Sequence, residues 1–175
     1  PTENAGCLIP KPAEGQSQPP TVDVLATASR AAASLTVPQP VMYVGPDPRN
    51  NKWNALAVGL PVWVWADDQA PQSTSVNEQG IQIDMTATRG EVSVDWGDGT
   101  TTVCSSMTPR PPNIEPMTKS PDCGHVYQQA GDYTITVTAS WSVAWAALGQ
   151  TGSVGLESST GYGLRVGEFV SVVAV

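Results

Sequence analysis

Strict alternation of apolar and polar side chains runs through residues 133–145. Every second residue is apolar or aromatic, in the order Tyr133, Ile135, Val137, Ala139, Trp141, Val143 and Trp145. Successive side chains of a β-strand point to opposite faces, so this period predicts one long strand with a single buried face. We expect such a long strand to bend or to be shared between two sheets.

Two shorter segments precede this strand and alternate in the same way. Residues 81–86 and 92–96 are predicted strands, and the Arg89-Gly90 pair between them predicts a turn. Residues 97–99 read Gly-Asp-Gly. They predict a tight turn, because Gly tolerates positive φ and Asp accepts hydrogen bonds from nearby backbone amides.

Further strand signals recur along the chain at short intervals. Val and Trp alternate over residues 62–65, a hairpin connection is expected at 148–152, and later strands are expected at 153–158 and 164–175. Six or seven short strands with this spacing predict an all-β fold, an Ig-like antiparallel β-sandwich. Residues 41–54 and 67–79 are left as irregular or loop segments.

The first 54 residues differ in composition from the rest. Residues 1–20 contain five Pro and predict a Pro-rich arm. Residues 21–35 are rich in Ala and predict one short helix with Thr21 as its N-cap. We therefore predict an N-terminal arm and helix over residues 1–54 and a sandwich domain over 55–175.

The formal net charge of −8 restricts the partners of the chain. A negative field repels nucleic-acid backbones and anionic membrane surfaces, so neither is an expected partner. No apolar run approaches the roughly 18 residues that a membrane-spanning helix needs. The partners we expect are other protein chains, including further copies of this one, or a polysaccharide.

Three cysteines bear on the compartment. Cys104 and Cys123 flank a Pro-rich excursion and are predicted to form a disulfide, which implies an oxidising compartment and thus a secreted or cell-surface protein. Closing a loop of this length contributes roughly 3 kcal/mol in the chain-entropy model. Cys7 is left over, as a free thiol or a link to another chain.

Three motifs together resemble the PKD (polycystic kidney disease) domain, a seven-stranded Ig-like sandwich that is usually extracellular. They are the turn with Trp96, Gly97, Asp98 and Gly99, the pair His125 and Tyr127, and the corner with Gly131 and Tyr133. The resemblance covers about residues 80–145. It implies that Trp96 fills the core, that the Tyr127 hydroxyl bonds to backbone, and that Asp98 satisfies turn amides. The Cys-bounded loop before His125 is longer than in that family.

A wider pattern is similar to a group of secreted actinobacterial proteins of unassigned function. The matching pieces are residues 59–65, 123–127 and 164–168. This similarity implies export and supplies no activity.

Few residues point to chemistry. His125 is the only histidine, and a Ser-His-Asp mechanism would need it together with Ser105 or Ser106 and Asp95 or Asp122. No nucleophile-elbow sequence accompanies them, so we predict a structural histidine, no catalytic residue and no cofactor. Asp84, Glu91, Asp95 and Asp98 read as solvated surface charge rather than as a glycosidase pair.

The sequence does not predict a metal site either. Asp95, Asp98 and Asp122 are the best calcium candidates, but the dense acidic loop that binds Ca²⁺ is missing. Among the six tryptophans, Trp53 lies in a polar, Pro-rich neighbourhood and is the candidate for an exposed binding residue. Packing in the core or in a crevice is the favoured interpretation of the tryptophans.

These observations favour a non-enzymatic, exported protein that serves in adhesion or assembly at a cell surface. A surface-fibre or pilus-like subunit that uses its N-terminal arm for contacts between subunits is the sharper hypothesis. The alternatives are a carbohydrate-binding module with an exposed Trp, a secreted hydrolase of unrecognised type, and a virion decoration protein.

Overall fold

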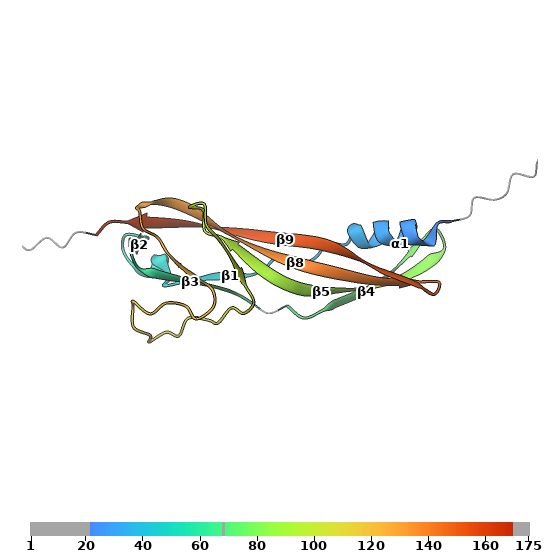
Figure 1. The fold of residues 1–175 in the computed structure, drawn as a ribbon, viewed down its shortest axis with the longest axis horizontal. Helices are drawn as coiled ribbons and strands as arrows, with labels where there is room; N and C mark the ends of the chain where they lie inside the picture. Colours follow the sequence, from blue (N-terminus) through green and yellow to red (C-terminus); the bar gives the residue numbers. More distant parts are fainter. Residues whose placement is uncertain (1–21, 68, 170–175) are drawn as a thin grey trace, which may run out of the picture.

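The computed structural model describes residues 22–67 and 69–169 as an elongated molecule with three long antiparallel strands (Figure 1). These are β5 (Ile81–Asp95), β8 (Gly131–Ala147) and β9 (Gln150–Gly167). They belong to a six-stranded sheet with the order β2-β9-β8-β5-β4, in which β6 also pairs with β5. The long strand predicted from residue 133 is confirmed as β8.

One end of the molecule is a β-sandwich, which we call the sandwich half. A second sheet, with the order β1-β3-β7, contains β1 (Met42–Gly45), β3 (Pro61–Ala66) and β7 (Gly124–Val126). The six-stranded sheet contributes β2 (Leu56–Ala57) and β6 (Thr101–Cys104) at this end, each paired with the end of a long strand. The predicted all-β, sandwich-like class is confirmed.

The other end, which we call the helix half, has one sheet covered by a helix. Helix α1 (Val24–Ala33) contacts β8, β9, β5 and β4 (Gln72–Glu78). Its N-cap is Asp23, whose carboxylate accepts a hydrogen bond from the Ala26 amide at 3.1 Å. The predicted N-cap Thr21 lies outside the described residues. Ala28 and Ala32 are fully buried, because their small side chains allow the helix backbone to approach the sheet.

One continuous core joins the two halves. The alternating face of β8 is buried from Ile135 to Trp145, with no side chain more than 3% exposed. Trp96 and Tyr127 are among the largest fully buried side chains in the sandwich half. Period 2 therefore predicted the core face of this strand correctly.

The predicted turn at Arg89-Gly90 is wrong. Strand β5 continues through it with a register shift between Arg89 and Val92 against β8. The Ser140 hydroxyl donates to the Glu91 carbonyl at 2.9 Å, and a Cβ on Gly90 would lie 2.8 Å from the Ser140 oxygen. Gly90 therefore lies at an irregularity within the strand, where its missing Cβ leaves room for the Ser140 hydroxyl, rather than in a turn.

Three further expectations are corrected. The strands expected at 153–158 and beyond 164 form a single strand, β9, of 18 residues. A strand, β4, occupies most of the loop expected at 67–79, and β1 lies in the segment expected to be irregular. Because β1 pairs with β3 and α1 packs on the large sheet, the structure brings residues 24–45 into the same layers as the later strands. In the described part of the chain, no helix is long and apolar enough to cross a membrane.

Candidate functional site

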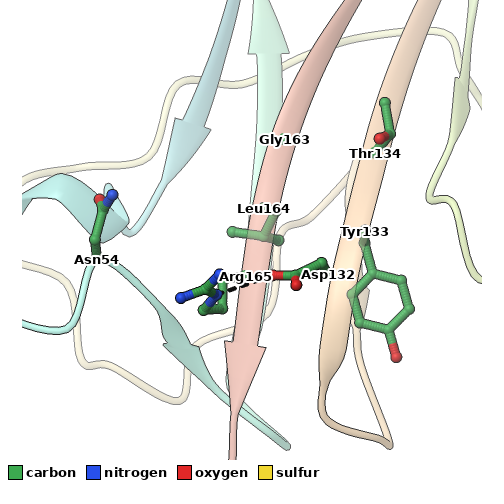
Figure 2. A pocket seen from close by; sticks show the side chains of 7 residues that line it. All are labelled: Asn54, Asp132, Tyr133, Thr134, Gly163, Leu164 and Arg165. Carbon is green, nitrogen blue, oxygen red and sulfur yellow. Dashed lines mark hydrogen bonds and ion pairs between the residues drawn. The ribbon is translucent and has the colours of Figure 1, made fainter.

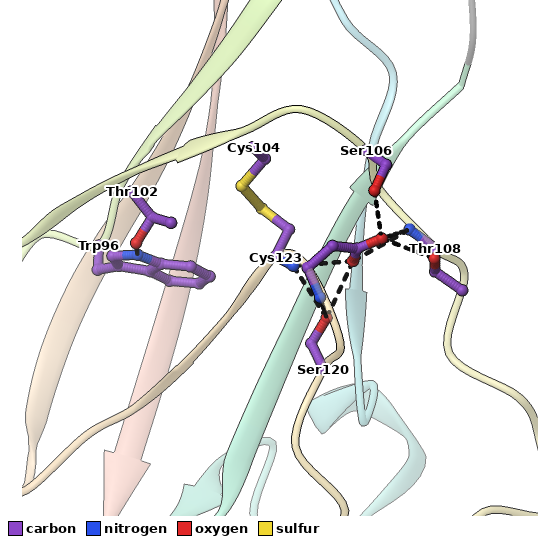
Figure 3. Close-up of a disulfide and its surroundings, with 8 residues drawn as sticks. Trp96, Thr102, Cys104, Ser106, Thr108, Ser120 and Cys123 are labelled. Carbon is purple, nitrogen blue, oxygen red and sulfur yellow. Dashed lines mark hydrogen bonds between the residues drawn. A yellow bond between two sulfur atoms is a disulfide. The ribbon is translucent and has the colours of Figure 1, made fainter.

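Trp96, His125 and Tyr127 form an aromatic cluster at the end of β5. Trp96 is fully buried, and its indole N–H donates to the Thr102 hydroxyl at 3.0 Å (Figure 3). The Tyr127 hydroxyl donates to the Trp96 carbonyl at 2.7 Å. The His125 ring stacks on Trp96 with centroids 5.1 Å apart. Burial and the nearby Asp98 charge raise the pKa of Tyr127 far above its usual value, so its hydroxyl stays a donor.

The turn that follows Trp96 is held by its own carboxylates. Asp95 accepts from the Gly97 amide at 2.9 Å, and Asp98 accepts from the Thr100 amide and hydroxyl at 3.0 and 2.6 Å. Gly97 has a φ of +77°, and a Cβ there would lie 2.6 Å from the Thr134 carbonyl oxygen. Only glycine fits this close approach.

The Gly131-Asp132-Tyr133 corner extends the aromatic cluster. The rings of Tyr127 and Tyr133 lie with centroids 4.3 Å apart. The Tyr133 hydroxyl donates to the Gln129 carbonyl at 3.0 Å. Gly131 begins β8, and a Cβ there would lie 3.2 Å from the Tyr133 ring. These contacts hold the β7-to-β8 connection against the turn after Trp96.

His125 pairs with Asp98, through Nε2 and a carboxylate oxygen 2.7 Å apart. Both side chains are largely covered, at 18% and 22% exposure. Partial burial alone would raise the pKa of Asp98. The hydrogen bonds from Thr100 and His125 outweigh that effect and hold the pKa below its usual value.

The residues proposed as triad partners of His125 make their hydrogen bonds to other groups. Asp95 bonds within the turn, and the Ser106 hydroxyl donates to Asp122 at 2.9 Å. A cavity of about 250 Å³ beside His125 is also lined by Ser120. The Ser120 hydroxyl donates to Asp122 and accepts from the Cys123 amide, so it serves the loop rather than the imidazole. The structure therefore does not assemble the proposed triad.

The disulfide between Cys104 and Cys123 is present and joins the two sheets, because Cys104 ends β6 and Cys123 precedes β7 (Figure 3). Asp122 closes the base of the intervening loop, accepting from the Thr108 amide and hydroxyl at 3.0 and 2.6 Å. Burial alone would raise the pKa of Asp122, but these hydrogen bonds outweigh that effect and hold the pKa below its usual value. Cys7 lies outside the described residues.

The loop at residues 105–121 covers the outer face of β3. The indole N–H of Trp63 donates to the Thr118 carbonyl at 2.8 Å, and Trp63 is only 3% exposed. This cover explains why β3 is buried on both faces, although Val and Trp alternate along it.

The three calcium candidates do not form a metal site. Within residues 22–67 and 69–169, no group of three or more His, Cys, Asp or Glu side chains is placed to hold a metal ion. Asp95 and Asp98 serve the turn, whereas Asp122 serves the base of the loop.

Trp53 is 57% exposed and contacts Phe169, which follows β9. The two rings are 5.0 Å apart and tilted by 59°, and the Lys52 ammonium lies 4.6 Å from the Trp53 ring. The pair is an exposed apolar spot rather than a flat platform for a sugar. A hollow of about 400 Å³ includes the adjacent Asn54 and the exposed ion pair of Arg165 with Asp132 (Figure 2).

The open side of β9 is the most extensive feature that the sequence did not reveal. β9 pairs with β8 from Gln150 to Val166, but on its other side it pairs only with β2, at Val166 and Gly167. No described strand or loop makes backbone hydrogen bonds to residues 150–165 from that side. We call this side of residues 150–165 the open edge.

A second feature that the sequence did not reveal is a cavity of about 420 Å³ in the sandwich half. Tyr43 and Trp65 contribute stacked rings, Tyr162 comes from β9, and Arg110 comes from the 105–121 loop. The Val-Trp alternation that predicted β3 was the only sequence signal for any of these residues. Segments that are distant along the chain meet there, so no local motif predicts the site.

No family model matches this chain, and no curated protein or solved structure matches it.

Proposed function

We propose that this protein is a non-enzymatic structural subunit of a cell-surface assembly, and that subunits associate by strand addition at the open edge of β9. The donor in this proposal is the Pro-rich arm, residues 1–20, of a second copy. The open edge is the observation that carries the proposal. The disulfide supports an oxidising, extracytoplasmic location.

An unprotected edge strand is a template for another chain, because its backbone amides and carbonyls lack partners. Natural edges are blunted by shortness, by Lys or Pro, or by bulges. The 18 residues of β9 contain no Lys or Pro, and the pairing of β9 with β8 has no register shift. Residues 35–39 lie against its middle, where the Ser158 hydroxyl donates to the Pro38 carbonyl at 2.7 Å, but they make no backbone-to-backbone hydrogen bond with β9. The opposite edge strand, β4, has only seven residues.

The side chains of the open edge are suited to a neighbouring strand. Residues 150–163 are exposed or half-buried, and Glu157 is the one charged residue among them. Strand addition draws its affinity from main-chain hydrogen bonds, so it needs an accessible backbone more than a particular side-chain pattern. The four glycines Gly152, Gly155, Gly161 and Gly163 leave that backbone accessible.

The test is the concentration dependence of mass, measured by sedimentation velocity on the full chain and on a chain lacking residues 1–20. We expect the full chain to form larger species as its concentration rises, and the shortened chain to remain monomeric. Equal assembly of the two chains would exclude the arm as donor.

A matched pair of variants tests the edge itself. Ser153→Lys with Ser159→Lys places two charges along β9, and Thr74→Lys with Asn77→Lys places two along β4; all four positions are exposed. We expect only the β9 variant to lose assembly, because Lys on an edge strand disfavours pairing. Loss of assembly in the β4 variant alone would assign the contact to the other edge.

A further inference from the structure

The cavity that contains Arg110 is built from four separate parts of the chain. It has a volume of about 420 Å³, within the range of small-molecule sites. β1 supplies Tyr43, β3 supplies Trp65, β9 supplies Tyr162, and the 105–121 loop supplies Arg110. We call it the Arg110 pocket.

Two arginines line this pocket, Arg49 and Arg110. The protein supplies a hydrogen-bond acceptor for Arg49 but not for the Nε of Arg110. Its Nε is buried and has no hydrogen-bond partner. Arg49, by contrast, donates three side-chain hydrogen bonds to Asp47, so its charge is already compensated. No ion pair forms between Arg110 and any residue in 22–67 or 69–169. A buried donor without an acceptor costs about 1–3 kcal/mol, and more when it is charged.

The backbone is shaped to hold the Arg110 side chain in place. A Cβ on Gly45 would lie 2.9 Å from Arg110 Cδ and 3.0 Å from the Trp65 ring. The aliphatic stem of Arg110 therefore packs in the space that glycine leaves, beside the indole. This packing fixes the guanidinium in the pocket without a protein acceptor.

The aromatic side chains are also held in position. The rings of Tyr43 and Trp65 stack at 15° with centroids 5.8 Å apart. The Tyr43 hydroxyl donates to Asp67 at 3.1 Å, and this bond raises the pKa of Tyr43. Burial and the Asp47 charge raise the pKa of Tyr162, which keeps its hydroxyl protonated as a donor.

We propose that the Arg110 pocket binds an acidic sugar, with the carboxylate on the Arg110 guanidinium and the sugar ring against Tyr43 and Trp65. A guanidinium prefers a planar carboxylate, which it binds with two parallel hydrogen bonds. Aromatic rings pack against the apolar face of a pyranose by dispersion and area burial. The tryptophan of this site is thus Trp65 rather than the exposed Trp53.

The experiment is a titration of the full chain with a tetrasaccharide of glucuronic acid and, separately, with the neutral tetrasaccharide of glucose. Calorimetry and tryptophan fluorescence report binding. We expect the acidic sugar to bind at least tenfold more tightly than the neutral one. Absence of that preference, or equal displacement of the acidic sugar by inorganic phosphate, overturns the proposal.

Two glutamine variants locate the site. Arg110→Gln removes the charge and is expected to weaken binding of the acidic sugar at least tenfold. Lys119→Gln removes a charge from the same loop, outside the pocket lining, and is expected to leave binding unchanged. Thermal unfolding of Arg110→Gln confirms that the variant is folded, because it shortens a side chain that packs beside Gly45 and Trp65. Wild-type affinity in a folded Arg110→Gln protein overturns the assignment.

Discussion

The sandwich half and the helix half share three strands but differ in what covers them. In the sandwich half, a second sheet, a disulfide and the fully buried Trp96 and Tyr127 cover the long strands. In the helix half, one ten-residue helix covers them with Ala28 and Ala32. Both halves bury tryptophan, Trp96 in one and Trp145 in the other, but only the sandwich half has a second sheet and a disulfide, so we expect it to resist local opening more strongly.

The largest effect tests the core of the sandwich half. Trp96→Ala should lower the free energy of unfolding by about 3–5 kcal/mol, because it leaves a large cavity and removes the indole bond to Thr102. Urea denaturation measures the change. A loss below about 1 kcal/mol would show that this half does not depend on its aromatic cluster.

Removal of the disulfide should have the next largest effect. The pair Cys104→Ala and Cys123→Ala is expected to cost roughly 3 kcal/mol, since the loop spans 19 residues. Hydrogen exchange should show faster opening of β6 and β7, with α1 unchanged. Faster exchange in α1 to the same extent would mean that the two halves open as one unit.

The helix cap should give a smaller and more local effect. Asp23→Ala removes the acceptor of the Ala26 amide and should cost about 1 kcal/mol. The α1 amides should lose protection from hydrogen exchange while those of β3 keep theirs. Asp23→Asn is the matched control, because its side-chain oxygen still accepts the bond.

Acid sensitivity should be the smallest effect, and it too should concentrate in the sandwich half. The folded-state pKa of Asp98 lies below its unfolded value, so its contribution is fully present above about pH 3.9. That contribution is lost as the pH falls through the lowered folded-state pKa. Thermal unfolding of Asp98→Asn should therefore depend less on pH below 4 than unfolding of the parent chain. An identical pH dependence would show that Asp98 does not contribute to the acid sensitivity of the fold.

Local patterns predicted the parts of the structure that depend on neighbours in sequence. The alternation from Tyr133 to Trp145 predicted a core strand, and the flanking positions of Cys104 and Cys123 predicted the disulfide. The sequence predicted two separate strands in place of β9, because its glycines interrupt the apolar pattern. Pairing with β8 keeps β9 continuous in the structure. β4 was missed because most of its side chains are exposed, so its pattern lacks a buried face.

The candidate sites were harder to predict than the strands. Trp53 was only a candidate for exposure, with core or crevice packing favoured, and the structure leaves it exposed beside a tilted partner rather than on a flat platform. Asp98 was predicted to bind turn amides, and its pairing with His125 was not foreseen. The open edge and the Arg110 pocket both depend on which strands become neighbours, and residue patterns do not contain that information.

The amino-acid sequence alone determined that this chain builds pleated sheets and which residues of β8 face the core. Those outcomes follow from side-chain period and from turn chemistry, which act over a few residues. The tertiary structure alone decided that β9 ends the sheet with one side unpaired, and that Arg110 meets Trp65 and Tyr162. These outcomes depend on how distant segments pack, because hydrogen bonding and burial are shared among all the strands at once.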